Sequence, residues 1–267
     1  MLADYDWIAP REASLKAKAA AARALEIDDS IEEAHATHAD IKRFFDWDWA
    51  GAEQEYRRAI ELNPNYPTAH QWYGEFLSAM GRHHEAVREM RRAEELDPLS
   101  LVVKSANGWV LYFARRYDDA IEQCQKVIEM DGSFSEVYSQ LRRAYEQKGM
   151  YREAMDSDER LRHSRRAVAR EKIEGRTPSD ARAYWQAILE LTKQDLKNKE
   201  GVEVRLAEAY AQLGEKDRAM ELLERAYEKH SCWMPFLNVH PNLDPLHFDP
   251  GFERMRERVG LKSTDNN

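Results

Sequence analysis

Apolar residues recur along the chain at helical spacing, in runs that end in the same short turn. The run E-L-N-P ends at Pro64, E-L-D-P at Pro98 and E-M-D-G at Gly132, so successive endings lie 34 residues apart (98 − 64 and 132 − 98). An earlier run, E-I-D-D, ends at Asp29, which is 35 residues before Pro64. Apolar stripes of this period, each closed by a turn residue, predict pairs of helices repeated along the chain.

Small residues follow the same period. Alanine recurs every 34 residues in the second predicted helix of each unit, at Ala52, Ala86, Ala120 and Ala154. Gly74 and Gly108 repeat in the first helix, where we expect the two helices of a pair to approach closely. Further glycines fall in the predicted turns, at Gly81, Gly149 and Gly214. The repeat is therefore carried by packing positions as well as by turns.

This pattern resembles the tetratricopeptide repeat, a helix–turn–helix unit of about 34 residues with small residues at the helix contacts. The resemblance implies an all-α fold, a right-handed α-solenoid of about six helix pairs, because each pair buries its apolar stripe only against its neighbours. Its expected parts are an N-terminal half repeat at 1–32, four units at 33–161, a degenerate helix pair at 162–200, one further unit at 201–231, and an extended capping tail with a short helix at 232–267.

The two ends of the chain depart from the repeat. Residues 10–27 are amphipathic and correspond to the second helix of a pair, so we expect the chain to begin with a half repeat or to be truncated. The last segment holds several prolines between Pro235 and Pro250, which favours an extended path and then a short helix near 249–259. Since the open end of a solenoid exposes an apolar face, we expect this tail to cover it.

Composition narrows the class of protein. The chain is 43% hydrophobic and 33% charged with only 11 glycines and 9 prolines, which favours helices over a β-sandwich. Its formal net charge of −9 makes it a poor general ligand for nucleic acid and for anionic membranes. The start shows no signal-peptide pattern and no apolar run reaches the roughly 20 residues of a membrane span. We therefore expect a cytoplasmic location with no nucleic-acid or membrane partner.

The stretch F-D-W-D-W-A-G at 45–51 places two tryptophans in the predicted turn between the helices of one pair. A W-x-W motif suits a stacking box for a ligand, and it equally suits packing between repeats. Because Trp47 and Trp49 directly precede the packed positions of the next helix, we favour packing, with the turn held onto the neighbouring repeat. Asp46 or Asp48 is placed to cap that helix.

In tetratricopeptide repeats the first helix of each pair lines the concave groove, where a partner binds. Counting along the repeats gives the candidate residues of a partner-binding groove: Gln71, Glu75, Ser105, Trp109, Tyr112, Phe113, Ser139, Arg143 and Glu146. Trp109, Tyr112 and Phe113 share one helix face, and aromatic and arginine side chains dominate the energetics of many binding surfaces. The alternatives are packing of these rings against the adjacent repeat and, for Arg143, a charge paired within the scaffold.

Some proteins with these repeats hold the C-terminal carboxylate of chaperones through a clamp of Lys, Asn and Arg in the groove. The equivalent positions here carry Thr37 and Ile41, Gln71 and Glu75, and Ser105 and Trp109. We therefore predict a protein or peptide partner, but no binding of chaperone tails.

The sequence contains no constellation typical of catalysis or of metal binding. His35 and His38 lie one helical turn apart, without Cys or carboxylate neighbours at ligand spacing. Cys124 and Cys232 are 108 residues apart and form no C-x-x-C motif, so we expect buried thiols, with a disulfide left open. The basic run at 160–176 is interrupted by glutamates, which favours a solvated helix face over a contact with nucleic acid or an acidic partner. We predict no catalytic residues, no metal and no cofactor.

Three runs resemble a narrower group of proteins. They are D-W-D-W-A-G-A-E-Q-E-Y-R-R-A-I-E-L-N-P at 46–64, G-W-V-L-Y-F-A-R-R-Y-D-D-A-I-E-Q at 108–123 and L-D-P-L-H-F-D-P-G-F at 243–252. Together they are similar to the C-terminal repeat regions of large bacterial regulators, which carry winged-helix DNA-binding, serine/threonine protein-kinase or nucleotide-cyclase domains. The chain has no G-x-G-x-x-G, H-R-D or D-F-G motif, so no enzymatic activity carries over.

Two functional hypotheses follow. The first is a non-enzymatic protein–protein interaction scaffold that takes a peptide segment or a partner domain in its concave groove. The alternative is the C-terminal sensor or regulatory segment of a bacterial transcription regulator or signalling kinase, whose output domain is missing from this chain.

Overall fold

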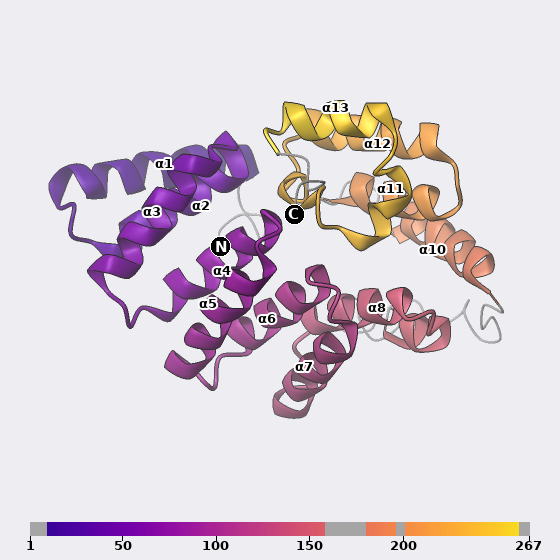
Figure 1. Cartoon of the computed structure of the whole chain (residues 1–267), viewed down its shortest axis with the longest axis horizontal. Helices are drawn as coiled ribbons and strands as arrows, with labels where there is room; N and C mark the ends of the chain where they lie inside the picture. Colours follow the sequence, from indigo (N-terminus) through magenta and orange to yellow (C-terminus); the bar gives the residue numbers. More distant parts are fainter. Residues whose placement is uncertain (1–9, 158–179, 196–200, 262–267) are drawn as a thin grey trace.

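The computed structural model describes residues 10–157, 180–195 and 201–261. Every regular element in these ranges is helical, and the helices stack into one right-handed, curved solenoid (Figure 1). The all-α prediction is therefore confirmed. The basic run at 160–176 and the first helix of the predicted degenerate pair lie outside the described residues.

Helices alternate regularly through the first part of the chain. They are α1 (Pro10–Ile27), α2 (Glu32–Ile41), α3 (Trp49–Leu62), α4 (Pro67–Ala79), α5 (His83–Leu96), α6 (Leu101–Phe113), α7 (Tyr117–Met130) and α8 (Glu136–Gln147), and residues 151–157 are helical as well. A π-helical turn, η2 (Lys42–Asp46), joins α2 to α3. The closest packing is within pairs, α2 on α3, α4 on α5 and α6 on α7, so the pairs follow the predicted repeat.

The turns between pairs repeat with the period of the helices. Asp28, Asn63 and Asp131 each accept a hydrogen bond at Oδ1 from the backbone N–H two residues later, at 2.9, 3.0 and 2.8 Å. Such a turn satisfies backbone groups at the point where one helix ends and the next pair begins. The repeated sequence pattern thus fixes where helices end as well as which helix faces are apolar.

The recurring small residues lie where helices touch. The repeated alanines are all buried: Ala52, Ala86, Ala120 and Ala154. A Cβ added at Gly108 would come within 2.7 Å of Gln140 Oε1, and one added at Gly74 within 3.0 Å of Met90 Sδ. These two glycines therefore permit the close approach of helices that the pattern predicts.

The second part of the chain continues the solenoid and then turns back onto α6 and α8. Its elements are α10 (Ala181–Asp195), α11 (Val202–Gln212), α12 (Lys216–Glu228), the 3₁₀ turns η3 (Met234–Phe236) and η4 (Pro241–Leu246), and α13 (Pro250–Arg258). α10 packs on α11, and α11 on α12, so the solenoid runs on through this part. Asp249 caps α13, since its carboxylate accepts from the N–H groups of Gly251 and Phe252.

The tail after α12 covers the end of the solenoid, as predicted. Most of its apolar side chains lie in one buried cluster with residues of α11 and α12, and they include Met234, Leu237, Leu243, Leu246 and Phe252. The prolines keep the path short and irregular between these anchors. The tail is therefore part of the core at this end of the molecule.

The solenoid curls so that the indigo N-terminal helices at the upper left of Figure 1 approach the yellow α13 at the upper right, and a hydrogen bond joins the start of α3 to the end of α13. The Nε1–H of Trp49, at the start of α3, donates to the carbonyl of Val259 at 3.0 Å. The ring of Trp47 stacks on His230 and contacts Tyr227, with centroids 4.5 and 5.2 Å apart. These five residues form what we call the end clasp.

The end clasp corrects the prediction for the W-x-W turn. The prediction that Trp47 packs against the neighbouring repeat is wrong. Its ring packs on His230, near the other end of the chain, because the curvature of the solenoid brings that end close to it. Asp48 is the capping residue of α3, since it accepts from the N–H of Gly51 at 3.0 Å. The motif thus joins the two ends of the molecule.

Candidate partner-binding groove

The aromatic residues predicted for the groove form a cluster on α6. The ring of Trp109 stacks on Phe113 and meets Tyr112 edge-on, with centroids 5.6 and 5.8 Å apart. Two aromatic residues from the tail complete the cluster: Trp233 lies edge-on to Trp109 at 5.3 Å, and Phe236 stacks on Phe113 at 4.8 Å. The concave face of α6 is therefore occupied by the chain's own C-terminal segment.

Burial of the α6 rings is nearly complete. Tyr112 is 0% exposed and Phe113 2% exposed, and burial raises the pKa of the Tyr112 hydroxyl well above its ordinary value. Trp109 is half-buried. A ligand reaches Tyr112 and Phe113 only after the segment that contains Phe236 has moved.

Arg143, on α8, joins the aromatic cluster to a polar network. Its Nη1 donates to Glu208 Oε2 at 2.6 Å and to His240 Nε2 at 3.1 Å. Its guanidinium also lies over the rings of Trp109 and Trp233, 5.6 and 5.1 Å from their centroids. Arg143 thus contacts α6, α11 and the tail at once.

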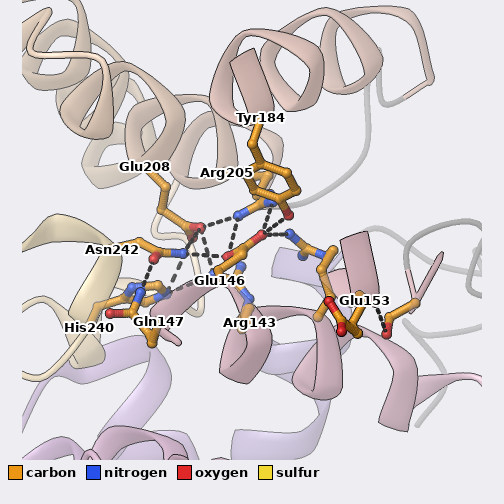
Figure 2. Close-up of polar contacts among 11 residues, drawn as sticks. Arg143, Glu146, Gln147, Glu153, Tyr184, Arg205, Glu208, His240 and Asn242 are labelled. Carbon is orange, nitrogen blue, oxygen red and sulfur yellow. Dashed lines mark hydrogen bonds and ion pairs between the residues drawn. The ribbon is translucent and has the colours of Figure 1, made fainter. Parts of the chain in front are cut away.

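Glu146, one helical turn after Arg143, is the second centre of this network (Figure 2). Its carboxylate accepts from Arg142 at 2.7 Å, Arg205 at 2.7 Å, the Tyr184 hydroxyl at 2.6 Å and Asn242 Nδ2 at 2.9 Å. These donors come from α8, α11, α10 and η4. One buried carboxylate therefore fastens the tail and two later helices to the concave face of α8.

The electrostatics keep the carboxylate charged and the histidine neutral. Burial, the largest single effect, raises the pKa of the Glu208 carboxyl, but Arg143 and the other neighbouring groups together outweigh it, and the pKa lies below its ordinary value. Burial lowers the pKa of His240 to about 3, so its imidazole is neutral at pH 7 and accepts from Arg143. The Glu208 carboxylate is held in its charged form by the neighbouring arginine.

The network is suited to holding chain segments together. Glu146 and Glu208 are shielded from water and are each paired with arginine, which suits a structural role. Among the described residues, no three His, Cys, Asp or Glu side chains are arranged to hold a metal ion. In the same ranges, no helix combines the length and apolar character needed to cross a membrane.

The other predicted groove residues do not join this cluster. Gln71 donates to Glu75 within α4 at 3.0 Å, and Glu75 Oε2 lies 3.6 Å from the guanidinium of the buried Arg43. Ser105 is buried and accepts from a glutamine of α8 at 2.6 Å. Ser139 donates to a backbone carbonyl of its own helix at 2.9 Å. Of the predicted set, the structure brings together the three aromatic residues of α6 and two charged residues of α8, Arg143 and Glu146.

Several residues of the groove were missed from the sequence. Glu208 stands at the same position of its repeat as Glu75, Trp109 and Arg143, so the same count extended to the unit at 201–231 would have found it. Other missed residues lie in the tail, outside any repeat: Trp233, Phe236, His240 and Asn242. No periodic signal marks these.

The fold defines a protein built from helical repeats. Models of the family described as tetratricopeptide repeat match residues 55–88 and residues 202–231. The chain therefore contains tetratricopeptide repeats, as the pattern predicts. Neither match indicates a catalytic family.

Two curated relatives match part of the chain. It is 35% identical over 86 residues to small glutamine-rich tetratricopeptide repeat-containing protein 2 of Mycosarcoma maydis, a match that covers 32% of this chain and 24% of that protein. It is 31% identical over 96 residues to Hsp70-Hsp90 organizing protein 2 of Arabidopsis thaliana, covering 36% of this chain and 17% of that protein. The chain thus matches about a quarter or less of the length of these relatives.

Among solved structures, the chain is similar to PilW, titled a widely conserved type IV pilus biogenesis factor. The TM-score is 0.54 at 16% identity, over 80% of this chain and 86% of that one. At this identity the likeness shows the fold alone. None of these matches shows the resemblance to bacterial regulators or kinases, which stays a hypothesis.

Proposed function

We propose that this protein is a non-enzymatic interaction scaffold that binds a segment of a partner protein on the concave faces of α6 and α8. One observation carries the proposal: these faces already hold an irregular piece of polypeptide with tight turns, residues 233–242, through stacked rings and charged hydrogen bonds. A surface that binds chain in this way within the molecule has the chemistry to bind it from another molecule.

The energetically important residues are expected to be few. Aromatic and arginine side chains at the centre of a binding surface dominate affinity, and Trp109, Phe113 and Arg143 are of this kind. Glu146 adds a buried acceptor for amide or cationic groups of the partner. Four predicted residues stay candidates for contacts at the margin of the surface: Gln71, Glu75, Ser105 and Ser139.

The test compares the proteins that bind in the native host. Tagged protein is cross-linked in cells, and captured proteins are compared between the unsubstituted chain and Trp109→Ala. We expect specific partners to be lost with Trp109→Ala and kept with Arg58→Ala, a control whose side chain is 46% exposed on α3. The same partners with all three proteins, at equal helical content, would count against this groove.

Chaperone tails deserve a separate test. The clamp positions carry no Lys or Arg, which is why we predict no binding. The comparisons do not support this exclusion, since one relative is named an Hsp70-Hsp90 organizing protein. Calorimetric titration with a C-terminal acidic chaperone peptide decides the question, and a micromolar complex would contradict the prediction.

A regulatory segment is the second candidate function. The three runs that resemble bacterial regulators each contain a residue that contacts the C-terminal part of the chain or its partner surface: Trp47 in the first, Trp109 in the second and Asp244 in the third. A solenoid closed by such contacts suits a sensor that opens and closes to regulate an attached output domain. An immunoblot of the native product decides: a band far above the 31.2 kDa of this chain supports the regulator, and one near that mass supports a free-standing scaffold.

A cytoplasmic location also stays a prediction.

A further inference from the structure

The segment between α12 and α13, residues 231–247, has two faces that contact different parts of the molecule. On one face Met234, Leu237 and Leu246 are fully buried with α11 and α12 in a single apolar cluster. This face belongs to the core of residues 201–261, which we call the C-terminal lobe. Peeling the segment away would break that core, so the segment and the lobe can only move as one body.

The other face of the segment meets the concave side of the earlier repeats. Trp233 and Phe236 lie on the rings of α6, and Asn242 donates to the buried carboxylate of α8. At the rim, Arg115 binds Asp244 through two charge-assisted hydrogen bonds of 2.5 and 2.7 Å. This second face therefore fills the predicted groove.

The two faces differ in chemistry. The first is aliphatic, and exposing it to water is costly. The second is mixed: Trp233, Phe236 and Val239 pack on apolar residues of α6, and guanidinium groups, amides and carboxylates lie beside them. Its charged members regain hydration when they separate, so the buried ion pairs contribute little net stability. Contacts of mixed polar and apolar composition are typical of parts that associate and separate. Opening the groove side leaves the core of the C-terminal lobe intact.

We propose that the C-terminal lobe is an internal occupant of the groove, and that it swings off α6 and α8 to admit a partner segment of the same chemistry. This inference rests on the proposed function of the groove and adds the nature of its occupant. The segment presents two aromatic side chains three residues apart, Trp233 and Phe236, with an amide six residues later at Asn242. The partner segment carries two aromatic residues at i and i+3, followed by a hydrogen-bonding side chain.

The end clasp, which lies outside the groove, also holds the C-terminal lobe in its closed position. Trp47 and His230 stack on each other although both have positive φ, a backbone region that residues with a Cβ rarely adopt. Strained residues of this kind persist only when surrounding contacts fix them, and they concentrate at clamps and switches. Removing the Trp47 ring therefore favours the open state without touching α6 or α8.

The experiment measures binding of a labelled peptide to the full chain. The probe is fluorescein-labelled peptide 230–248 with Cys232→Ser, followed by anisotropy. The apparent affinity of a groove that is mostly closed is reduced by the fraction that is open. We expect Trp47→Ala to bind the probe about tenfold more tightly than the unsubstituted protein. Asp244→Asn, which removes only the rim contact, should give a smaller gain in the same direction.

Matched controls make the outcome decisive. Phe45→Ala, two residues before Trp47 and 39% exposed, should bind like the unsubstituted protein. A probe with both Trp233→Ala and Phe236→Ala should not bind. If Trp47→Ala and Asp244→Asn keep full helical content and gain no affinity, the lobe does not gate the groove and the inference is overturned. A stable dimer of Trp47→Ala by light scattering would support opening of the lobe but overturn a separate partner as the new occupant, since a second copy then fills the groove.

The proposed function can fail independently. If native partners are unaffected by Trp109→Ala while the probe still binds Trp47→Ala, the groove serves only its internal occupant and the scaffold proposal falls. If native partners are lost but the probe never binds, the scaffold stands and the gating inference falls.

Discussion

The indole ring of Trp47 lies on the imidazole ring of His230, with centroids 4.5 Å apart and planes inclined by 22°. Both residues have a φ of 50°, in the left-handed region that costs a residue with a Cβ about 1–2 kcal/mol. They belong to opposite ends of the solenoid and meet only because the solenoid closes. Their contact therefore depends on the curvature of every repeat between them.

Trp49→Phe isolates the hydrogen bond between the two ends. The substitution keeps an aromatic ring at the start of α3 but removes the Nε1–H that donates to the Val259 carbonyl. Since the carbonyl loses its donor, we expect the free energy of unfolding to fall by about 1 kcal/mol in urea titrations. Trp72→Phe, within the N-terminal repeats, is the control, and equal losses for both variants would speak against a role in closure.

The repeat was predictable because its signals are local. Ala52 and Ala86 are buried at the same position of successive units, and Asn63 closes its own turn, so a single unit records these positions. The closure was not predictable, since Trp47 meets His230 through rotation summed over all the repeats. No local pattern records such a sum.

The candidate site shows the same division. The concave positions of Trp109 and Arg143 follow from counting, because each repeat presents the same helix face to the groove. Their occupant does not follow, because Trp233 lies in an irregular, proline-rich tail whose path is set by apolar anchors in the last repeat. The open end of the solenoid predicts that this tail covers it, but no feature of the sequence predicts that the tail also fills the groove.

Glu208→Ala tests the buried network between α8 and α11. The substitution leaves the guanidinium groups of Arg143 and Arg205 without their shared carboxylate. Breaking a buried pair on one side leaves charge without compensation, so we expect a loss of about 3–5 kcal/mol in the free energy of unfolding, measured by urea titration.

The control for Glu208 is a carboxylate in an exposed ion pair. Glu221 pairs with Arg225 at 3.0 Å on the surface of α12, and its side chain is 67% exposed. Exposed pairs contribute about 0–1 kcal/mol, so Glu221→Ala should change stability little. Similar losses of stability in Glu208→Ala and Glu221→Ala would show that the buried network stabilises the protein no more than an exposed ion pair does.

Gly108→Ala tests the close approach of α6 to α8. The new Cβ would lie 2.7 Å from Gln140 Oε1, and the amide of this buried glutamine already donates to Ser105 at 2.6 Å. Since Gln140 cannot move without weakening that bond, we expect a loss of about 1–3 kcal/mol despite the better helix propensity of alanine. Gly132→Ala is the control, since its Cβ would meet nothing closer than 3.6 Å, and it should leave the stability nearly unchanged. Thermal melts of both variants measure the difference.

His240 should make stability depend on pH. The side chain is buried and burial lowers its pKa to about 3, whereas a histidine in the unfolded chain titrates near about 6.5. Between these two values the unfolded chain binds a proton that the folded chain does not. The free energy of unfolding therefore falls as pH falls from about 6.5 toward 3, and the contribution is constant above 6.5.

We expect His240 to lower the free energy of unfolding by about 2 kcal/mol between pH 7 and pH 5, because each pH unit below the unfolded pKa costs about 1.4 kcal/mol. His240→Gln keeps an acceptor for Arg143 but takes up no proton, so most of this difference should disappear. His84→Gln, at an exposed position of α5, should keep the full difference. Urea titrations at both pH values measure it, and an equal difference in His240→Gln and the unsubstituted protein would contradict a neutral, buried His240 at the centre of the groove.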